Sequence, residues 1–222
     1  MNIKNTATAG LLVVALLMVA TQFCRADEDS TSSGPSWGIK GMIGAGYPNY
    51  ANLPSGVTTN PAVSWAVGGL VIWSGEGVVS FAFQPELQFV QENGVSTGFT
   101  HRVDGQEVTY EITTTVNSLR LPVLGKVQFL DPRIVQPSLY AGPSFSYVLT
   151  ATNEAQGVHY DVEDNTFQVG LTAGVDVTIL SFLVVDVRFN TNFTNLSYDI
   201  GEIASGIDLT TSSFLVGLAF RF

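Results

Sequence analysis

The chain has 222 residues, of which 45% are hydrophobic and only 13% are charged, and its formal net charge is −10. An average soluble domain carries roughly 25% charged residues, and disorder requires low hydrophobicity, so the composition excludes a disordered chain. The 22 Gly and 14 Phe residues stand beside a single Cys and nine Lys and Arg residues. These counts exclude a zinc module, a disulfide scaffold and a basic nucleic-acid-binding protein.

The first 26 residues have the layout of a secretory signal peptide. Lys4 supplies the positive charge, residues 11–20 form an unbroken apolar run, and small residues occupy both cleavage positions of Cys24-Arg25-Ala26. We expect cleavage after Ala26. An uncleaved membrane anchor is the weaker alternative, because a spanning helix needs about 20 apolar residues. Lipid attachment at Cys24 is weaker still, because the large Phe23 precedes it.

Cleavage would leave seven cations against 19 acids, a formal net charge of −12, and no cysteine. An exported chain without cysteine gains no disulfide, so its stability must come from burial or from a membrane. Residues 27–36 are rich in Ser, Thr and acids and are expected to form a flexible leader, followed by one domain over residues 37–222. The negative charge also opposes the approach of nucleic acid.

From Trp37 onward apolar residues occupy alternate positions, which is the period of a β-strand with one apolar face. The clearest segment, residues 167–179, alternates apolar residues with Gln, Gly, Thr and Asp. In chain order the predicted strands are residues 39–47, 63–73, 79–89, 119–129, 139–147, 167–179, 183–192 and 213–222. The alternation predicts an all-β fold. The even number of strands fits an eight-stranded antiparallel up-and-down barrel.

The connections between these segments alternate in length. The short ones are residues 74–77, 130–135 and 179–182, and the long ones are residues 48–61, 91–107, 150–165 and 195–209. All long connections therefore lie at one end of the barrel and all tight turns at the other. This arrangement is typical of transmembrane barrels of the outer membrane, with short periplasmic turns, long external loops and both termini in the periplasm.

The same alternation fits a soluble lipocalin-like barrel or a β-sandwich, in which the apolar face would point inward. The polar positions favour the membrane barrel, because they carry mostly Gly, Ser, Ala and Thr, whereas a water-facing surface is richer in Lys and Glu. The lumen of an eight-stranded barrel is just wide enough to be filled by such side chains.

Charged residues at the polar positions are predicted to form a salt-bridge lattice inside the lumen, because buried charges require partners. They comprise five cations and three anions: Lys40, Glu86, Arg120, Lys126, Asp176, Asp186, Arg188 and Arg221. An ion-conducting lining is the alternative. Aromatic residues near the strand ends are expected to form interfacial girdles, with core filling as the alternative; they are Trp73, Phe89, Phe129, Phe193, Phe220 and Phe222.

Residues 118–126, Ser-Leu-Arg-Leu-Pro-Val-Leu-Gly-Lys, are similar to the Leu-x-Ile-Pro-x-Leu-x-Lys stretch of PorT-like outer-membrane β-barrel proteins of Gram-negative bacteria. Residues 84–87, 141–144 and 186–189 resemble further positions of this family, although Ser118 stands where the family often has Tyr. Phe220 and the terminal Phe222 resemble the aromatic C-terminal signal that the barrel-assembly machinery recognises. The resemblance implies an eight-stranded barrel in the outer membrane and not the secretion role of the namesake.

No catalytic, cofactor or metal site is predicted. His101 and His159 are the only histidines, both in predicted external loops, and no spacing signature links them to Asp104, Asp161 or Ser96. Acidic residues in the last two long loops lack the spacing of an EF-hand, so a solvated acidic rim is the simpler interpretation. The glycines at 41, 44 and 46 do not form a phosphate loop, because their segment is a predicted strand.

The sequence thus predicts a non-enzymatic outer-membrane barrel with a structural, adhesive or interaction role through its external loops. The alternative is a narrow channel or transporter for a small or apolar solute, and a lipid-modifying enzyme ranks third. The expected partners are outer-membrane lipid and lipopolysaccharide, the barrel-assembly machinery and a protein partner at the external loops.

Overall fold

The computed structural model of the chain describes residues 34–51, 58–75, 77–103, 106–130, 134–155, 158–161, 167–200 and 204–222. The chain divides by its contacts into two units, Met1–Pro35 and Ser36–Phe222, and the barrel is the second unit. The predicted signal peptide, residues 1–26, and residues 27–33 of the predicted leader lie outside the described residues. None of the helices searched in the described ranges is long and apolar enough to cross a membrane.

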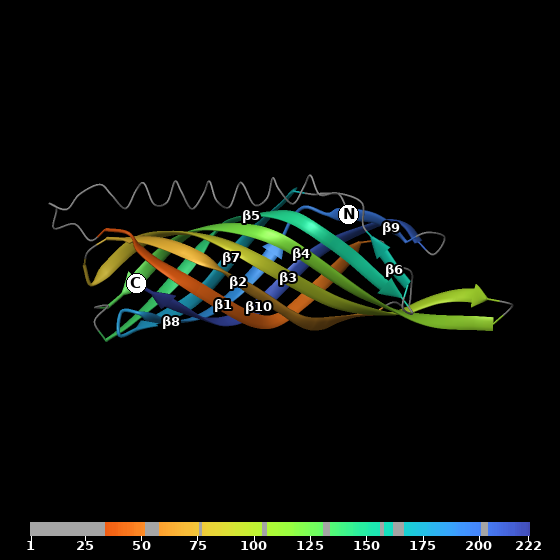
Figure 1. Cartoon of the computed structure of the whole chain (residues 1–222), viewed down its shortest axis with the longest axis horizontal. Coiled ribbons are helices and arrows are strands. Elements are labelled where there is room, and N and C mark those ends of the chain that lie inside the picture. Colours follow the sequence, from red (N-terminus) through yellow and green to blue (C-terminus); the bar gives the residue numbers. More distant parts are fainter. Residues whose placement is uncertain are drawn as a thin grey trace. The chain divides into compact units, whose positions relative to one another are not determined.

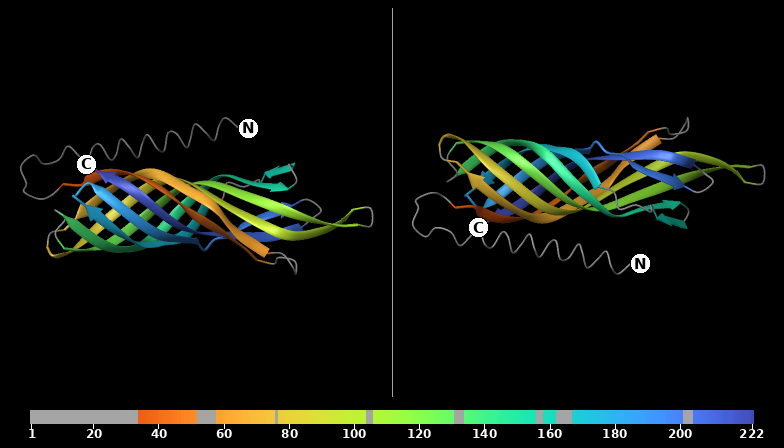
Figure 2. Two further views of the ribbon diagram at one scale, coloured as in Figure 1. Left: turned by 90° about the horizontal axis from the view of Figure 1, so that it is seen from below. Right: turned by 90° about the horizontal axis from the view of Figure 1, so that it is seen from above.

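Ten strands occur in the described part of the chain, and eight of them form the barrel wall (Figures 1 and 2). The wall strands are β1 (Ser36–Ala51), β2 (Thr58–Ser74), β3 (Val79–Val103), β4 (Gln106–Phe129), β5 (Val135–Ala155), β7 (Phe167–Ile179), β8 (Leu183–Asn192) and β10 (Ala204–Arg221). Each pairs antiparallel with its neighbours, and β10 pairs with β1 to close the ring. The eight-stranded antiparallel barrel predicted from the alternation is therefore confirmed.

The wall turns its apolar face outward. On β10, Phe214, Val216 and Leu218 are 46%, 44% and 51% exposed, whereas the intervening Leu215 and Gly217 face inward and are buried. On β8, Asp186 and Arg188 are fully buried between outward-facing valines. This is the reverse of a soluble barrel, so the apolar surface is the outer one and requires a lipid environment.

The inward positions fill the lumen with side chains, most of them polar. Ser, Thr, Asn and Gln residues are buried there together with eight charged residues, and apolar residues are the minority. Two small apolar clusters lie among them, one around Met42, Ala66, Val90 and Leu215, the other around Leu70, Val184 and Ala219. A filled lumen is what the diameter of an eight-stranded barrel allows.

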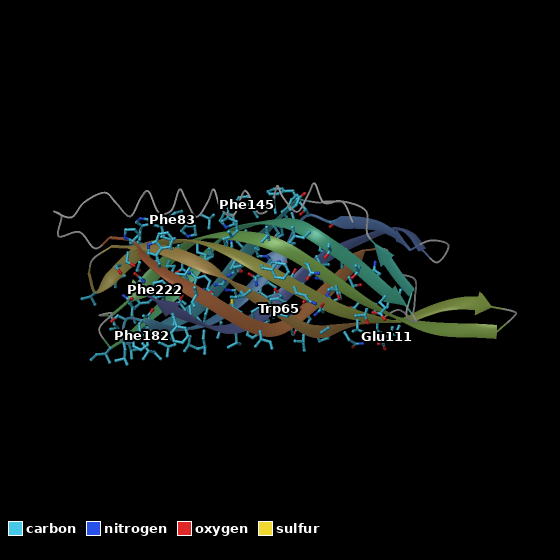
Figure 3. All side chains as sticks on the ribbon, viewed as in Figure 1. Trp65, Phe83, Glu111, Phe145, Phe182 and Phe222 are labelled. Atoms are coloured by element: carbon cyan, nitrogen blue, oxygen red, sulfur yellow. The ribbon has the colours of Figure 1, made fainter. Side chains whose placement is uncertain are left out.

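Aromatic side chains lie on the outer surface of the barrel. Trp73, Phe193, Phe220 and Phe222 are 40%, 64%, 48% and 76% exposed, and Figure 3 shows Phe222 at the margin of the barrel. Pairs of rings also contact each other across neighbouring strands, with centroids 5.5 Å apart for Trp65 and Phe89. These aromatic side chains face outward, so they do not fill the core.

The tight turns fall where the sequence predicts them, at residues 75–78, 130–134 and 180–182. The long connections lie at the opposite end from the tight turns, as predicted, but most of their residues continue the strands and do not form irregular loops. β3 and β4 stay paired from Gln91 and Asn117 as far as Val103 and Gln106, so the ends of these two strands form a hairpin that projects beyond the other strands (Figure 1). Short strands β6 (Val158–Asp161) and β9 (Leu196–Ile200) occupy parts of the last two connections.

We call the end with the three tight turns the turn end and the opposite end the ribbon end. At the ribbon end the pairing of β1 with β2 stops at Gly46 and Ala62. β1 then continues beside β10, and β2 continues beside β3 to Thr58. The wall therefore divides into separate ribbons beyond the barrel.

Candidate functional site

Four charges lie in contact at the centre of the lumen. Lys40 Nζ is 2.8 Å from Glu86 Oε1 and 2.8 Å from Asp186 Oδ2. Arg188 donates to both carboxylates, with Nη1 2.9 Å from Glu86 Oε2 and Nη2 3.0 Å from Asp186 Oδ2. All four side chains are buried. We call Lys40, Glu86, Asp186 and Arg188 the central quartet; its formal charge is zero, which makes burial of four ions tolerable.

Lys126 and Asp176 extend this network. Lys126 Nζ donates to Asp176 and, over 3.0 Å, to Gln84 Oε1, and the Gln84 amide donates in turn to Glu86. Asp176 and Asp186 are direct cross-strand partners of β7 and β8. Like charges at such positions repel each other, so Lys126 and the central quartet supply the cations that this pairing needs.

Tyr140 occupies the space between the two parts of the network. Its hydroxyl donates to Asp186 Oδ1 over 2.7 Å, and its ring centroid lies 5.6 Å from Lys126 Nζ and 5.5 Å from the Arg188 guanidinium carbon. Gly174 makes room for it, because a Cβ at this position would lie 2.4 Å from the Tyr140 hydroxyl. The tyrosine thus adds cation–π contacts and a hydrogen bond to the ion pairs.

An ion pair separate from this network lies in the lumen toward the ribbon end. Arg120 Nη2 is 2.9 Å from Glu92 Oε1, and Arg120 Nε donates to Ser146 over 3.1 Å. Thr211 and Ser213 donate to the two Glu92 oxygens over 2.7 and 2.8 Å. Glu92 was not predicted, because residues 91–107 were expected to form a loop. Glu92 shares the even-numbered positions of Gln84, Glu86 and Gln88, but the apolar Val90 interrupts that polar series.

Arg221 is the one predicted lattice residue that these contacts do not include. It lies at the turn end, where its Nη2 donates to Ser36 Oγ over 2.9 Å. Its side chain is only partly buried because the strand ends there. With Glu92 included and Arg221 set apart, the described lumen contacts join four cations to four anions, instead of the five and three expected from the sequence.

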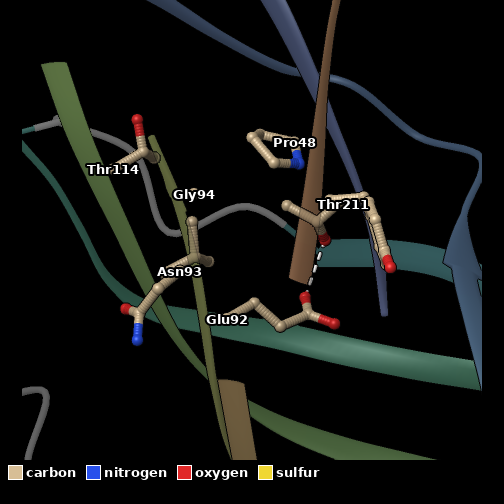
Figure 4. Close-up of a pocket in the computed structure, with 8 residues that line it drawn as sticks. Pro48, Glu92, Asn93, Gly94, Thr114 and Thr211 are labelled. Carbon is tan, nitrogen blue, oxygen red and sulfur yellow. Dashed lines mark hydrogen bonds between the residues drawn. The ribbon is translucent and has the colours of Figure 1, made fainter. Parts of the chain in front are cut away.

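A small cavity of about 10 Å³ lies beside Glu92, where β1 and β2 separate (Figure 4). Pro48 of β1 closes it by packing against Gly94 of β3, where a Cβ would lie 2.2 Å from Pro48 Cγ. The remaining lining residues are Tyr47, Asn93, Thr114, Val116 and Thr211. The space is comparable to a single water molecule, so the cavity does not accommodate an organic solute.

The residues weighed for catalysis do not form a site among the described side chains. His101 lies in β3 and His159 in β6, so both belong to strands and not to irregular loops. Ser96 lies in β3 with its side chain fully buried. The side chains of both histidines, Asp104 and Asp161 lie outside the described ones, as do those of the other residues of the predicted acidic rim, Glu163, Asp164, Asp199, Glu202 and Asp208. The described residues contain no group of three or more metal-ligating side chains.

The profile of one protein family, described as the outer membrane protein beta-barrel domain, matches residues 36–198. The chain belongs to this family. Membership of the outer membrane protein beta-barrel family agrees with the outward apolar face and indicates that the protein resides in the outer membrane. A search of curated proteins gave no match.

Three solved structures illustrate what this family member resembles. Neisserial surface protein A is 11% identical over 86% of this chain and 100% of its own, with a TM-score of 0.47. Ail, the attachment invasion locus protein of Yersinia pestis, crystallised with the heparin analogue sucrose octasulfate, is 10% identical over 85% and 99%, with a TM-score of 0.43. The N-terminal β-barrel domain of Pseudomonas aeruginosa OprF is 14% identical over 82% and 97%, with a TM-score of 0.34.

Proposed function

We propose that this protein is a non-enzymatic outer-membrane barrel whose ribbon end performs a structural, adhesive or interaction role. The observation that carries the proposal is the continuation of the wall strands beyond the apolar belt. Outward positions of β3 and β4 become polar at Gln91 and Asn117, yet the two strands stay paired as far as Val103 and Gln106. A paired ribbon on a rigid barrel holds its side chains in place for a partner, as binding loops do on other scaffolds.

The packing of side chains in the lumen supports a barrel that does not conduct ions or solutes. The central quartet and its neighbours bind one another across the interior, and Gln and Tyr side chains fill the space between them. The alternative of a narrow channel or transporter for a small or apolar solute would require these contacts to open. A conductance measurement distinguishes the two functions.

The finer assignments form part of the same proposal. Residues 118–126 support a place among the PorT-like proteins of Gram-negative bacteria, with a signal peptide cleaved after Ala26. Recognition of Phe220 and Phe222 by the barrel-assembly machinery is supported by the exposure of both side chains. Phe222 also exchanges two backbone hydrogen bonds with Trp37 of β1. The proposed partners are lipid and lipopolysaccharide around the belt and a protein at the ribbon end.

Shortening the β3–β4 hairpin tests the proposed role. Residues 98–110 are replaced by Asn-Gly, which favours a two-residue hairpin turn between the paired Thr97 and Glu111. Bacteria that express the full or the shortened chain are applied to immobilised extracellular-matrix proteins and glycans. We expect the shortened barrel to keep its heat-modifiable gel mobility and the cells to lose retention. Equal retention of both strains on every surface would contradict a role for this ribbon.

A further inference from the structure

The three tight turns expose apolar side chains. Val78, Leu130, Ile134, Leu180 and Phe182 are 75%, 55%, 71%, 57% and 48% exposed, and we call these five residues the apolar turn rim. Turns that face water are dominated by Gly, Asn, Asp, Ser and Pro, which have the required backbone freedom or hydrogen-bonding groups. Such residues occur here too, at Gly75, Gly77 and Ser181, so the unexpected feature is the five exposed apolar side chains beside them.

Two leucines of the rim also have an unfavourable backbone conformation. Leu130 and Leu180 have φ angles of 69° and 52°, in the left-handed region that Gly and Asn adopt more readily. The left-handed conformation does not favour leucine over Gly or Asn. We therefore look to the surroundings of the two exposed side chains for the reason that leucine occurs at both turns.

Backbone hydrogen bonds join the rim residues into one continuous surface. Leu130 N donates to Val78 O over 2.8 Å, and Leu180 N donates to Ile134 O over 3.0 Å. Arg221 N donates to Phe182 O over 2.7 Å and links the third turn to β10. The exposed side chains therefore lie on neighbouring turns of one edge of the barrel.

The rim continues the apolar belt without a polar interruption. On β4 the outward positions from Leu119 to Phe129 carry apolar residues or Gly, and Leu130 follows directly. A strand rise of about 3.3 Å at a tilt of about 40° advances roughly 2.5 Å per residue, so an apolar band of about 25 Å takes about ten residues. Counted from Leu119, this band reaches Phe129, so Leu130 and the rest of the rim lie at its edge, at the level where the acyl chains meet the head groups.

We propose that the apolar turn rim lies in the membrane, in contact with the acyl chains of the lipid leaflet at the turn end. Lipid is the occupant that the continuity with the belt selects, because the belt and the rim form one apolar surface. The barrel is then seated so that its turns, as well as its strands, contact lipid. This inference concerns the turn end and is independent of the role of the ribbon end.

Depth-dependent quenching tests the proposal on the full chain in phospholipid vesicles. The single cysteine is removed by Cys24→Ser, and Ile134→Cys or Leu180→Cys is introduced and labelled with a polarity-sensitive fluorophore. Val216→Cys, in the belt, and Thr59→Cys, an exposed residue at the ribbon end, are the matched controls. Heat-modifiable mobility shows that each labelled variant is folded.

Phosphatidylcholine brominated near the head-group end of its acyl chain and aqueous iodide serve as the two quenchers. We expect both rim labels to lose most of their fluorescence to the brominated lipid and little to iodide. The label at position 216, deeper in the belt, should be quenched less by this lipid and little by iodide, and the label at position 59 by iodide alone. Strong quenching of the rim labels by iodide alone would overturn the proposal. Protection from both quenchers that grows with the protein-to-lipid ratio would also overturn it, in favour of contact with a second copy.

Discussion

Glu92 and Arg120 show at the scale of single residues why the lumen charges must be paired. Both side chains are nearly fully buried, and two hydroxyl groups besides Arg120 contact the Glu92 carboxylate. Removing one partner of a buried ion pair leaves an uncompensated charge, whereas removing both partners together is often close to neutral. Removing Glu92 alone is therefore expected to lower the free energy of unfolding more than removing Glu92 and Arg120 together.

Glu92→Gln is expected to lower the free energy of unfolding by about 3 to 5 kcal/mol, because Arg120 keeps its charge and loses its counterion. The double change Glu92→Gln with Arg120→Met is expected to recover part of this loss. Urea unfolding of the natural protein, Glu92→Gln, Arg120→Met and the double variant in lipid vesicles gives the coupling energy. Additive effects of the two changes would show that the pair does not act as a unit.

Val187 tests the lipid environment of the wall at a single position. It faces outward on β8 between Val175 and Val216 of the neighbouring strands, near the middle of the apolar belt. Val187→Arg is expected to cost about 2 to 4 kcal/mol of folding free energy in vesicles, and Thr191→Arg, farther along the same outward face, about 0 to 1 kcal/mol. Similar costs at both positions, measured by urea unfolding, would argue against a membrane boundary between them.

At the scale of elements, the predictability of each strand depended on its surroundings. Within the belt one face contacts lipid and the other the polar lumen, so hydrophobicity alternates and residues 167–179 were predicted with their observed bounds. Beyond the belt this contrast disappears, although the backbone groups still pair, and the alternation of apolar residues no longer marks a strand. The missing ends of β3 and β4 and the missed Glu92 have this one cause.

The turns and the charge partners differ in the same way. Tight turns were predictable because they interrupt two clear alternating segments. The polar parity predicted that Lys40, Glu86, Asp186 and Arg188 face inward, but their pairing depends on the register of three separate strands, β1, β3 and β8. Lys40 and Asp186 are 146 residues apart in the sequence and meet only when the barrel closes. No local pattern carries such information, and for the same reason the sequence did not show that Arg221 donates to Ser36.

At the scale of the whole molecule, the central quartet joins strands from opposite parts of the sequence through contacts inside the lumen. Glu86 on β3 binds both Lys40 on β1 and Arg188 on β8 across the interior. The backbone ladder and the lipid contacts of the wall do not depend on these side chains. We therefore expect loss of the quartet to affect the conductance of the barrel more than its folding.

Replacing all four quartet residues by Ala removes two cations and two anions, so the formal charge is unchanged while the lumen loses its central side chains. We expect no conductance from the natural protein in planar bilayers and stepwise conductance from the quadruple variant, whose heat-modifiable mobility confirms folding. A matched control changes four outward residues to smaller ones: Ile43→Ala, Val67→Ala, Val187→Ala and Val216→Ala. The control should remain silent because only its lipid face changes. Conductance by the natural protein would favour the narrow channel, whereas a folded but silent quadruple variant would show that the remaining lumen side chains, with Arg120 and Glu92 among them, suffice to close the barrel.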